Sequence, residues 1–459
     1  MPKLQIIKII FLLLTLSTFI TGCSSYGVIN NEKQNNRYKP IESVYSIQSV
    51  LELKPQGRIA LVLTFSGGGT RAAALAYGVL LELRDTKLPH SKTETRLLDE
   101  VDIISAVSGG SFIAAYYGLN GNQTFKDFEK VMLKKDIEDE LISEVLNPLS
   151  WFSDTGRTQM AIQLYNTTIF KDATFADLKK PGRPLILINA SDLANGARFS
   201  FTQDYFDLIC SDISSFSVAK AVTASSAVPV VFNPVVLQNF QPCKNNALKK
   251  LSVSEKYIKD NLELQQAVHS LKEYASNNYP FLQLVDGGIT DNLGLRAIYE
   301  AIQFAGGPKA FLRKMNKKSV DHIAVISVDA STQSSQNIRM TNKSPTIQQS
   351  IDAMSDIQIH RYNDATLQLF KNSLTEWGNQ LSSPGHVVQP HFIKINFNEL
   401  ETQKEINEFN QIPTRLSLTE PDVAKLINAG RSLLKNNLEF QMLLQELDDD
   451  ESIQGKSNN

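Results

Sequence analysis

Val101-Asp-Ile-Ile-Ser-Ala-Val-Ser-Gly-Gly-Ser111 decides the fold, because an apolar run typical of a buried strand leads directly into a glycine-flanked serine and then into a helix. A strand that ends in so sharp a turn pushes the hydroxyl of Ser108 out above its sheet, and small neighbours let the strained backbone pass. The following helix directs its positive end at the same place, where anionic intermediates are stabilised. The pattern predicts a nucleophile elbow, although by itself it fits a tight turn with a surface serine equally well.

A second strand–loop–helix unit precedes the elbow. Residues 58–65 form an almost unbroken apolar run, 66–71 read Ser-Gly-Gly-Gly-Thr-Arg, and the residues that follow have the composition and period of a helix. Three successive glycines at the start of a helix leave several N–H groups bare and pointing one way, which makes an anion cradle. Beside an activated serine, we expect the amides of Gly67, Gly68 and Gly69 to form an oxyanion hole.

The glycine loop also admits a nucleotide-binding interpretation. Gly67-Gly-Gly-Thr-Arg-Ala72 fits the looser dinucleotide fingerprint, in which an acidic residue at the end of the next strand binds a ribose. That strand ends in Ser108 instead, and Glu100 and Asp102 lie at its beginning. No Lys-Ser/Thr pair follows the glycines, so a phosphate-binding P-loop is excluded. The sequence therefore disfavours a nucleotide site.

A third strand, 281–285, leads into Asp286-Gly287-Gly288. An aspartate at the carboxyl end of a strand faces the crevice where α/β sheets bind ligands. The alternative is an Asx-turn, in which Asp286 only caps its own backbone.

Together these pieces resemble the patatin-like phospholipase family, which combines a glycine-rich loop with a following Arg, a serine elbow and an Asp-Gly-Gly/Ala motif. Ala224-Ser-Ser-Ala-Val-Pro-Val-Val-Phe-Asn-Pro234 is similar to a fourth motif of that family, and the resemblance covers 58–328. One position departs from the family elbow, since Ala106 replaces its first glycine. The resemblance implies a three-layer α/β fold with a central, mostly parallel sheet flanked by helices, to which this chain adds helical segments.

The resemblance also implies a Ser–Asp dyad, with Ser108 as the nucleophile and Asp286 as its direct base. Supporting positions would be Arg71, Gly110, Gly287 and Gly288, with Arg71 either reinforcing the positive field or holding the loop. A Ser-His-Asp triad stays open, because triads are defined by geometry. However, none of the six histidines lies in a triad motif. We find no metal-ligand cluster in the sequence and expect no metal and no cofactor.

The first residues indicate export. Residues 1–22 have a positive start and a short apolar core, too short to span a bilayer, which predicts a secretory signal peptide. Ile20-Thr-Gly-Cys23 resembles a bacterial lipobox, so lipidation of Cys23 and, with Ser24 following, an outer-membrane location are expected; an ordinary signal peptide is the alternative. In an oxidising compartment a disulfide between Cys210 and Cys243 is as plausible as two free thiols.

The remaining organisation follows from composition and period. Residues 23–56 are expected to be a lipidated cysteine and polar tether, 57–440 one enlarged domain with 329–440 as its helical and strand extension, and 441–459 an acidic disordered tail. Further strands are predicted at 184–189, 197–201, 322–328 and 391–397, and outer helices at 344–370 and 419–444. The formal net charge of −2 offers no basic footprint for nucleic acid.

The family resemblance implies an acyl hydrolase of the phospholipase A or lysophospholipase type, anchored to a membrane, with phospholipid or lysophospholipid as its substrate. An acyltransferase that uses the same dyad is one alternative. A non-catalytic lipid-binding envelope lipoprotein on the same fold is another.

Overall fold

The computed structural model describes residues 27–34, 44–88, 95–137, 139, 156–229, 231–243, 247–250, 258–259, 261–332 and 342–457. The expected signal peptide (1–22) and the expected lipidation site, Cys23, lie outside the described residues. Within the described part of the chain, no helix is both long enough and apolar enough to cross a membrane.

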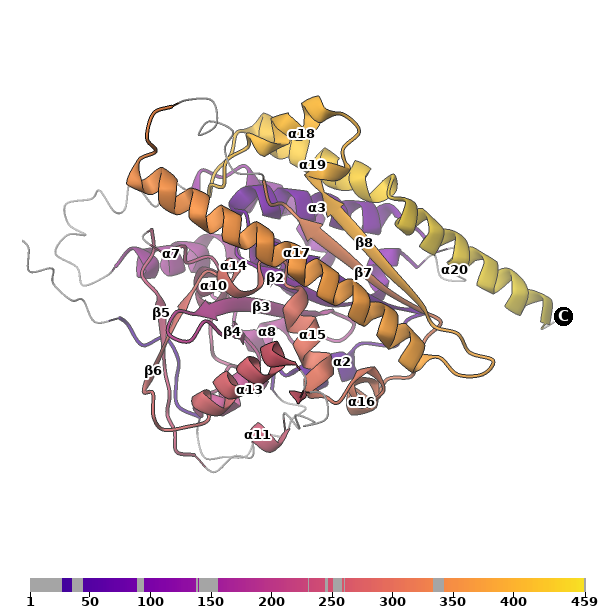
Figure 1. The fold of residues 1–459 in the computed structure, drawn as a ribbon, viewed down its shortest axis with the longest axis horizontal. Helices are drawn as coiled ribbons and strands as arrows, with labels where there is room; N and C mark the ends of the chain where they lie inside the picture. The colour runs from indigo at the N-terminus through magenta and orange to yellow at the C-terminus, as the bar shows by residue number, and fades with distance from the viewer. Residues whose placement is uncertain are drawn as a thin grey trace, which may run out of the picture.

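An eight-stranded mixed sheet forms the centre of the molecule, with strand order β5-β6-β3-β2-β1-β7-β8 and β4 paired to β3 beside this path (Figure 1). The five mutually parallel strands are β1 (Ile59–Phe65), β2 (Val101–Val107), β3 (Leu185–Asp192), β7 (His322–Asp329) and β8 (Gln389–Asn396). The antiparallel strands are β4 (Arg198–Ser200), β5 (Val235–Gln238) and β6 (Phe281–Val285). The central strands read as continuous apolar runs because helices cover both faces of the sheet.

Helices on the two faces complete three layers. One face carries α3 (Gly69–Asp85), α4 (Gly109–Asn120) and α19 (Glu420–Lys435), which pack against one another or against the sheet. The other face carries α15 (Leu295–Phe304), α16 (Pro308–Lys314) and the long α17 (Ile347–Leu381), which crosses in front of the strands in Figure 1. The connections between parallel strands thus run through helices that cover one face or the other of the sheet. The expected three-layer α/β fold is confirmed.

Shorter helices and the C-terminal helices fill the periphery. They are α2 (Ile47–Leu53), α5 (Thr124–Phe128), α7 (Arg157–Tyr165), α8 (Phe175–Leu178), α9 (Gln203–Phe206), α10 (Val218–Ser225), α11 (Ala247–Lys250), α13 (Leu262–Tyr274), α14 (Gly288–Asp291), α18 (Gln403–Asn410) and α20 (Leu438–Ser457). Cys210 and Cys243 form a disulfide. The disulfide joins a residue before β5 to one after it in the sequence. The sequence analysis did not predict β5.

The predicted polar tether is wrong for the parts of it that the structure describes. Asn31 donates from its side-chain amide to Ser211 Oγ at 3.1 Å and to the carbonyl of Gln238 at 2.9 Å, so this segment lies against β5. Further on, α2 buries Val50 and Leu51 in the core. Asn30 and Asn31 therefore bond to backbone groups at the sheet edge and are not part of a solvated linker.

The predicted disordered tail at 441–459 is also wrong over most of its length, because α20 continues to Ser457. Phe440, Leu443 and Leu447 recur at helical spacing and are all buried. The acidic run that begins at Asp448 hid this apolar stripe from the sequence analysis. Arg58 adds a hydrogen bond from its guanidinium to the carbonyl of Leu447 at 3.0 Å.

Candidate active site

Ser108 occupies a sharp turn between β2 and α4, with φ 50° and ψ −124°. A positive φ is uncommon and strained for a residue with a side chain, and such strain persists only where the surroundings fix it. Ala106 lies within β2 and is fully buried, so the missing family glycine is replaced in an ordinary strand position. The turn therefore has the geometry expected of a nucleophile elbow.

The two glycines after Ser108 allow the glycine loop to approach the elbow. A Cβ on Gly110 would lie 2.7 Å from both Phe65 Cβ and the carbonyl of Ser66. A Cβ on Gly109 would lie 2.6 Å from the backbone N of Gly69, closer than real side chains come. Only glycine at both positions lets the two loops pack together.

Asp286 meets Ser108 directly: Ser108 Oγ donates a hydrogen bond to Asp286 Oδ2 at 2.7 Å. The sheet explains this meeting. Although β6 runs antiparallel to β3, the two strands pair only through their last residues, Ser191 with Val285 and Asp192 with Leu284. Their carboxyl ends therefore coincide, and Asp286 emerges at the edge where β2 delivers Ser108.

The end of α10 and the residues directly after it contact both members of this pair. Ser225 Oγ accepts a hydrogen bond from the Ser108 amide at 2.8 Å and donates to the carbonyl of Asn189 at 2.6 Å. Its own carbonyl accepts from the Gly287 amide at 3.0 Å, and the carbonyl of Ala227 accepts from the Asp286 amide at 3.0 Å. The Ala-Ser-Ser-Ala stretch thus fixes the elbow relative to the Asp286 loop. The sequence analysis noted this motif but assigned it no such role.

Burial controls the charge of Asp286. Ser108 is 7% exposed and Asp286 is 9% exposed. Burial raises the pKa of the Asp286 carboxyl to about 6, against the opposing effect of hydrogen bonds from the Gly288 amide and the Ser108 hydroxyl. The Gly288 amide donates to Asp286 Oδ1 at 2.8 Å, which leaves Oδ2 directed at Ser108. A carboxylate with a raised pKa is a stronger base than an exposed aspartate.

The glycine loop differs in one respect from the expectation that three amides face the site. The Gly67 amide donates to the carbonyl of Asn292 at 3.1 Å, so it is already used. For the amides of Gly68 and Gly69, no protein acceptor occurs among the described residues. Gly68 precedes α3 with φ 138°, and Gly69 has φ 60°, conformations that favour glycine.

Gly109 is a candidate donor that the sequence analysis missed. Its amide immediately follows Ser108, the position that supplies an oxyanion-hole donor in hydrolases with a nucleophile elbow. It is also the first residue of α4, so its N–H has no partner within the helix. Gly68, Gly69 and Gly109 thus carry amides of the glycine loop and the elbow that have no protein acceptor among the described residues.

Arg71 has a structural place beside the loop. Its buried guanidinium donates to the carbonyls of Ala330 at 2.9 Å and Ile412 at 2.6 Å, and to Thr414 Oγ1 at 2.9 Å. Burial lowers the pKa of Arg71 to about 10, so the group remains a cation at neutral pH. These contacts tie the start of α3 to the segment before α19, which favours the loop-holding alternative for Arg71.

Gly287 and Gly288 are needed for close packing. A Cβ on Gly287 would lie 2.9 Å from Val107 Cγ1, and one on Gly288 would lie 3.1 Å from both Asp286 Oδ1 and Asn292 Oδ1. Asn292, which also accepts from Gly67, therefore joins the glycine loop to the Asp286 loop.

Histidine does not take part in the site as far as the structure describes it. No described histidine forms a hydrogen bond with Ser108 or Asp286. His90 lies outside the described residues. A separate apolar cavity of about 140 Å³ lies between the sheet and α15–α17, and neither Ser108 nor Asp286 lines it. We therefore place the candidate site at the serine–aspartate pair and not at that cavity.

Comparison with known proteins gives a family match. A family model described as patatin-like phospholipase matches residues 63–299, just over half of the 459 residues. No curated protein matches the sequence. Among solved structures, human GIVD cytosolic phospholipase A2 aligns with a TM-score of 0.41 and 12% identity, over 87% of this chain and 64% of that chain. VipD from Legionella pneumophila aligns with a TM-score of 0.31 and 12% identity, over 94% of this chain and 73% of that chain. The chain thus spans less than two thirds of the length of the human phospholipase.

Proposed function

The chain belongs to the patatin-like phospholipase family, and on that premise we propose that it is a lipid acyl hydrolase whose nucleophile is Ser108 and whose base is Asp286. The observation that carries this proposal is the direct 2.7 Å hydrogen bond from the strained serine to a buried carboxylate. No intervening imidazole is required, because the carboxylate itself accepts the hydroxyl proton.

In the proposed reaction, Ser108 Oγ attacks the carbonyl carbon of an ester while its proton passes to Asp286 Oδ2. The carbonyl oxygen becomes an oxyanion that the amides of Gly68, Gly69 and Gly109 stabilise. Asp286 then returns the proton to the leaving alcohol, and an acyl-serine ester remains. Water, deprotonated by Asp286, attacks this ester, releases the fatty acid and restores Ser108.

Exposed apolar side chains beside the dyad support a lipid substrate. Val228 is 44% exposed and follows the residue whose carbonyl holds the Asp286 amide. Ile289 is 49% exposed and lies three residues after Asp286. Water-exposed aliphatic groups on two adjoining loops suit contact with acyl chains or a lipid surface. We infer a phospholipid or lysophospholipid substrate of the phospholipase A or lysophospholipase type.

Anchoring at a membrane is a separate proposal that rests on the lipobox resemblance at Cys23. Acylation of that cysteine would hold the enzyme at its substrate, since two or more acyl chains give stable attachment. We propose an outer-membrane lipoprotein. Metabolic labelling with a palmitate analogue and membrane fractionation would test it: label and membrane association should both be lost in Cys23→Ala.

Ester hydrolysis by purified variants tests the dyad. Ser108→Ala and Asp286→Asn should each lower fatty-acid release from phospholipid vesicles by more than about a thousandfold, because each removes a reacting group. Ser373→Ala, a change at another buried serine whose hydroxyl bonds only within α17, is the matched control and should keep full activity.

Circular dichroism must show that the variants are folded. A folded Ser108→Ala protein that retains a tenth of the activity would rule out the assignment. The same lipid products, analysed with an added acceptor alcohol, separate hydrolysis from acyl transfer: a transferase forms a new ester in place of free fatty acid. A non-catalytic lipid-binding protein would release neither product and would not be labelled by a fluorophosphonate.

A further inference from the structure

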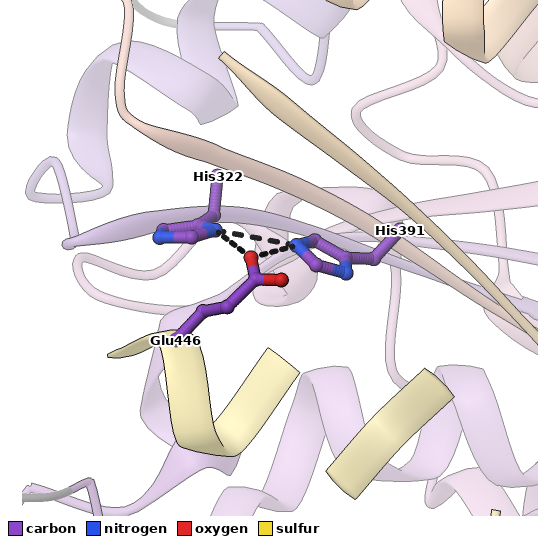
Figure 2. A group of neighbouring side chains, drawn as sticks. All are labelled: His322, His391 and Glu446. Atoms are coloured by element: carbon purple, nitrogen blue, oxygen red, sulfur yellow. Dashed lines mark hydrogen bonds and ion pairs between the residues drawn. The ribbon is translucent and has the colours of Figure 1, made fainter. Parts of the chain in front are cut away.

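A second cluster of reactive side chains lies at the opposite edge of the sheet, where β7 and β8 begin. His322, His391 and Glu446 direct their side chains toward one another (Figure 2). His322 Nδ1 lies 3.2 Å from His391 Nε2, and Glu446 Oε2 lies 3.6 Å from the first nitrogen and 3.3 Å from the second. Both histidine side chains are 4% exposed.

The sheet register brings the two histidines together. The strands β7 and β8 are parallel, with His322 opposite Gln389 and Ala324 opposite His391. Since side chains alternate between the faces of a strand, both histidines point to the same face. Glu446 approaches them from α20, which packs on β8 (Figure 2).

The three separations match the ligand shell of a small tetrahedral cation. With metal–nitrogen and metal–oxygen bonds of about 2.0–2.1 Å, neighbouring ligands of a tetrahedral Zn²⁺ lie about 3.3 Å apart. The three separations in the structure, 3.2, 3.3 and 3.6 Å, are close to that ligand-to-ligand distance. A single ion can therefore contact all three atoms with only small side-chain adjustments.

Glu439 supplies the outer support that such a site needs. Its Oε1 lies 3.0 Å from His391 Nδ1, and it comes from the same helix as Glu446. A carboxylate that accepts the Nδ1 proton leaves Nε2 of His391 with a lone pair. That lone pair then faces Glu446 Oε2, a buried oxygen with no hydrogen-bond donor among the described residues. In this tautomer, a cation that contacts both His391 Nε2 and Glu446 Oε2, which lie 3.3 Å apart, would satisfy both atoms.

We propose that His322 Nδ1, His391 Nε2 and Glu446 Oε2 bind a Zn²⁺ ion, with a water molecule as the fourth ligand. Two imidazoles and one carboxylate suit this ion. The ion would clamp α20 to the starts of β7 and β8. This inference departs from the expectation of no metal. The proposed ligands lie in three separate elements, so no spacing motif in the sequence could reveal them.

Zinc binding by the full chain, purified without an affinity tag, tests the proposal. After dialysis against EDTA, the protein should take up one Zn²⁺ per chain in competition with a chromophoric zinc indicator, and its melting temperature should rise. Glu446→Gln keeps the side-chain shape but should weaken binding at least about tenfold. Glu439→Gln, which removes only the outer support, should weaken it about tenfold to a hundredfold.

Glu408→Gln, an exposed change on α18, is the matched control and should bind zinc like the wild type. Co²⁺ substitution should give the visible absorption of a tetrahedral site in the wild type and not in Glu446→Gln. The proposal is overturned if the wild type binds no zinc at micromolar concentration. Equal zinc affinity of the wild type and Glu446→Gln would overturn it as well, because the ion would then lie elsewhere.

Discussion

The two edges of the central sheet present reactive side chains in opposite ways. At the carboxyl edge, Ser108 has a strained backbone and Asp286 is a buried carboxylate with a raised pKa. At the amino edge, His322 and His391 lie in regular strands and Glu446 in a regular helix. The eight residues of β7 separate the two edges by roughly 25 Å.

This difference shows what each arrangement can do. Strain and a desolvated charge cost stability but prepare a nucleophile and a base, as is usual where chemistry occurs. Side chains on unstrained strands and helices cost less stability, and their contacts can hold separate elements of the fold together. The comparison predicts that changes at the carboxyl edge alter turnover, whereas changes at the amino edge alter stability and leave turnover intact.

Outside the dyad itself, the largest effect should come from Gly109→Ala. The new methyl group would collide with the Gly69 backbone and push the glycine loop away from the elbow. Displacing an oxyanion donor should lower kcat about a hundredfold to a thousandfold, with a smaller change in KM. Steady-state kinetics on a soluble ester measures both constants.

Gly182→Ala is the matched control for this change. Unlike Gly109, Gly182 has a positive φ, of 74°, and a Cβ there would meet no atom within 4 Å. The control should lose some stability to backbone strain and keep its kcat. If Gly109→Ala keeps wild-type kcat, the contact between the two loops does not position the oxyanion donors.

A change on α20 tests the other half of the comparison. Leu443 is fully buried, so Leu443→Ala should lower the free energy of unfolding by about 2–5 kcal/mol through lost packing. Met442 is 52% exposed on the same helix, and Met442→Ala should change stability little. Urea unfolding gives both values. A marked loss of kcat in folded Leu443→Ala would show that the two edges are coupled and would break the comparison.

Much of the sheet was predictable because its strands are local apolar runs. Seven of the eight strands were expected within a few residues of their observed bounds. The exception is β5, which has only four residues and directly follows Pro234. The predicted helix at 419–444 covers only the first part of α20. Charge suggested disorder beyond it, while the burial of Leu447 depends on a surface that only the folded chain provides.

In the candidate site, too, residues in local motifs were predictable, whereas contacts between distant segments were not. Ser108 and Asp286 each follow a strand within a recognisable motif, and the structure brings them to hydrogen-bond distance. The supporting role of Ser225 could not be predicted, because its hydroxyl bridges the backbones of residues 36 and 117 positions away. The sequence also could not show that the Gly67 amide is unavailable to an oxyanion, because its acceptor is the backbone carbonyl of Asn292, far along the chain.

The smallest expected effect sharpens the comparison, because it measures how much the buried charge of Asp286 lowers the free energy of unfolding. Burial raises the pKa of Asp286 from 3.8 to about 6 in the folded protein. Between these values the folded state binds more protons than the unfolded state, so stability falls as pH rises. Above pH 6 the whole penalty is present, and a shift of this size corresponds to at most about 3 kcal/mol.

Asp286→Asn removes the charge and should therefore stabilise the fold most at alkaline pH. Its gain in unfolding free energy over the wild type should grow from near zero at pH 4 to about 2–3 kcal/mol at pH 8, as urea titrations can measure. Asp85→Asn should show no such gain between pH 4 and pH 8, because a hydrogen bond from Arg84 lowers the pKa of Asp85 and the folded protein therefore titrates this group below that range. If Asp286→Asn gained nothing between pH 4 and pH 8, the carboxylate would carry no desolvation penalty. Ser108 would then lack the strengthened base that the carboxyl edge is proposed to provide.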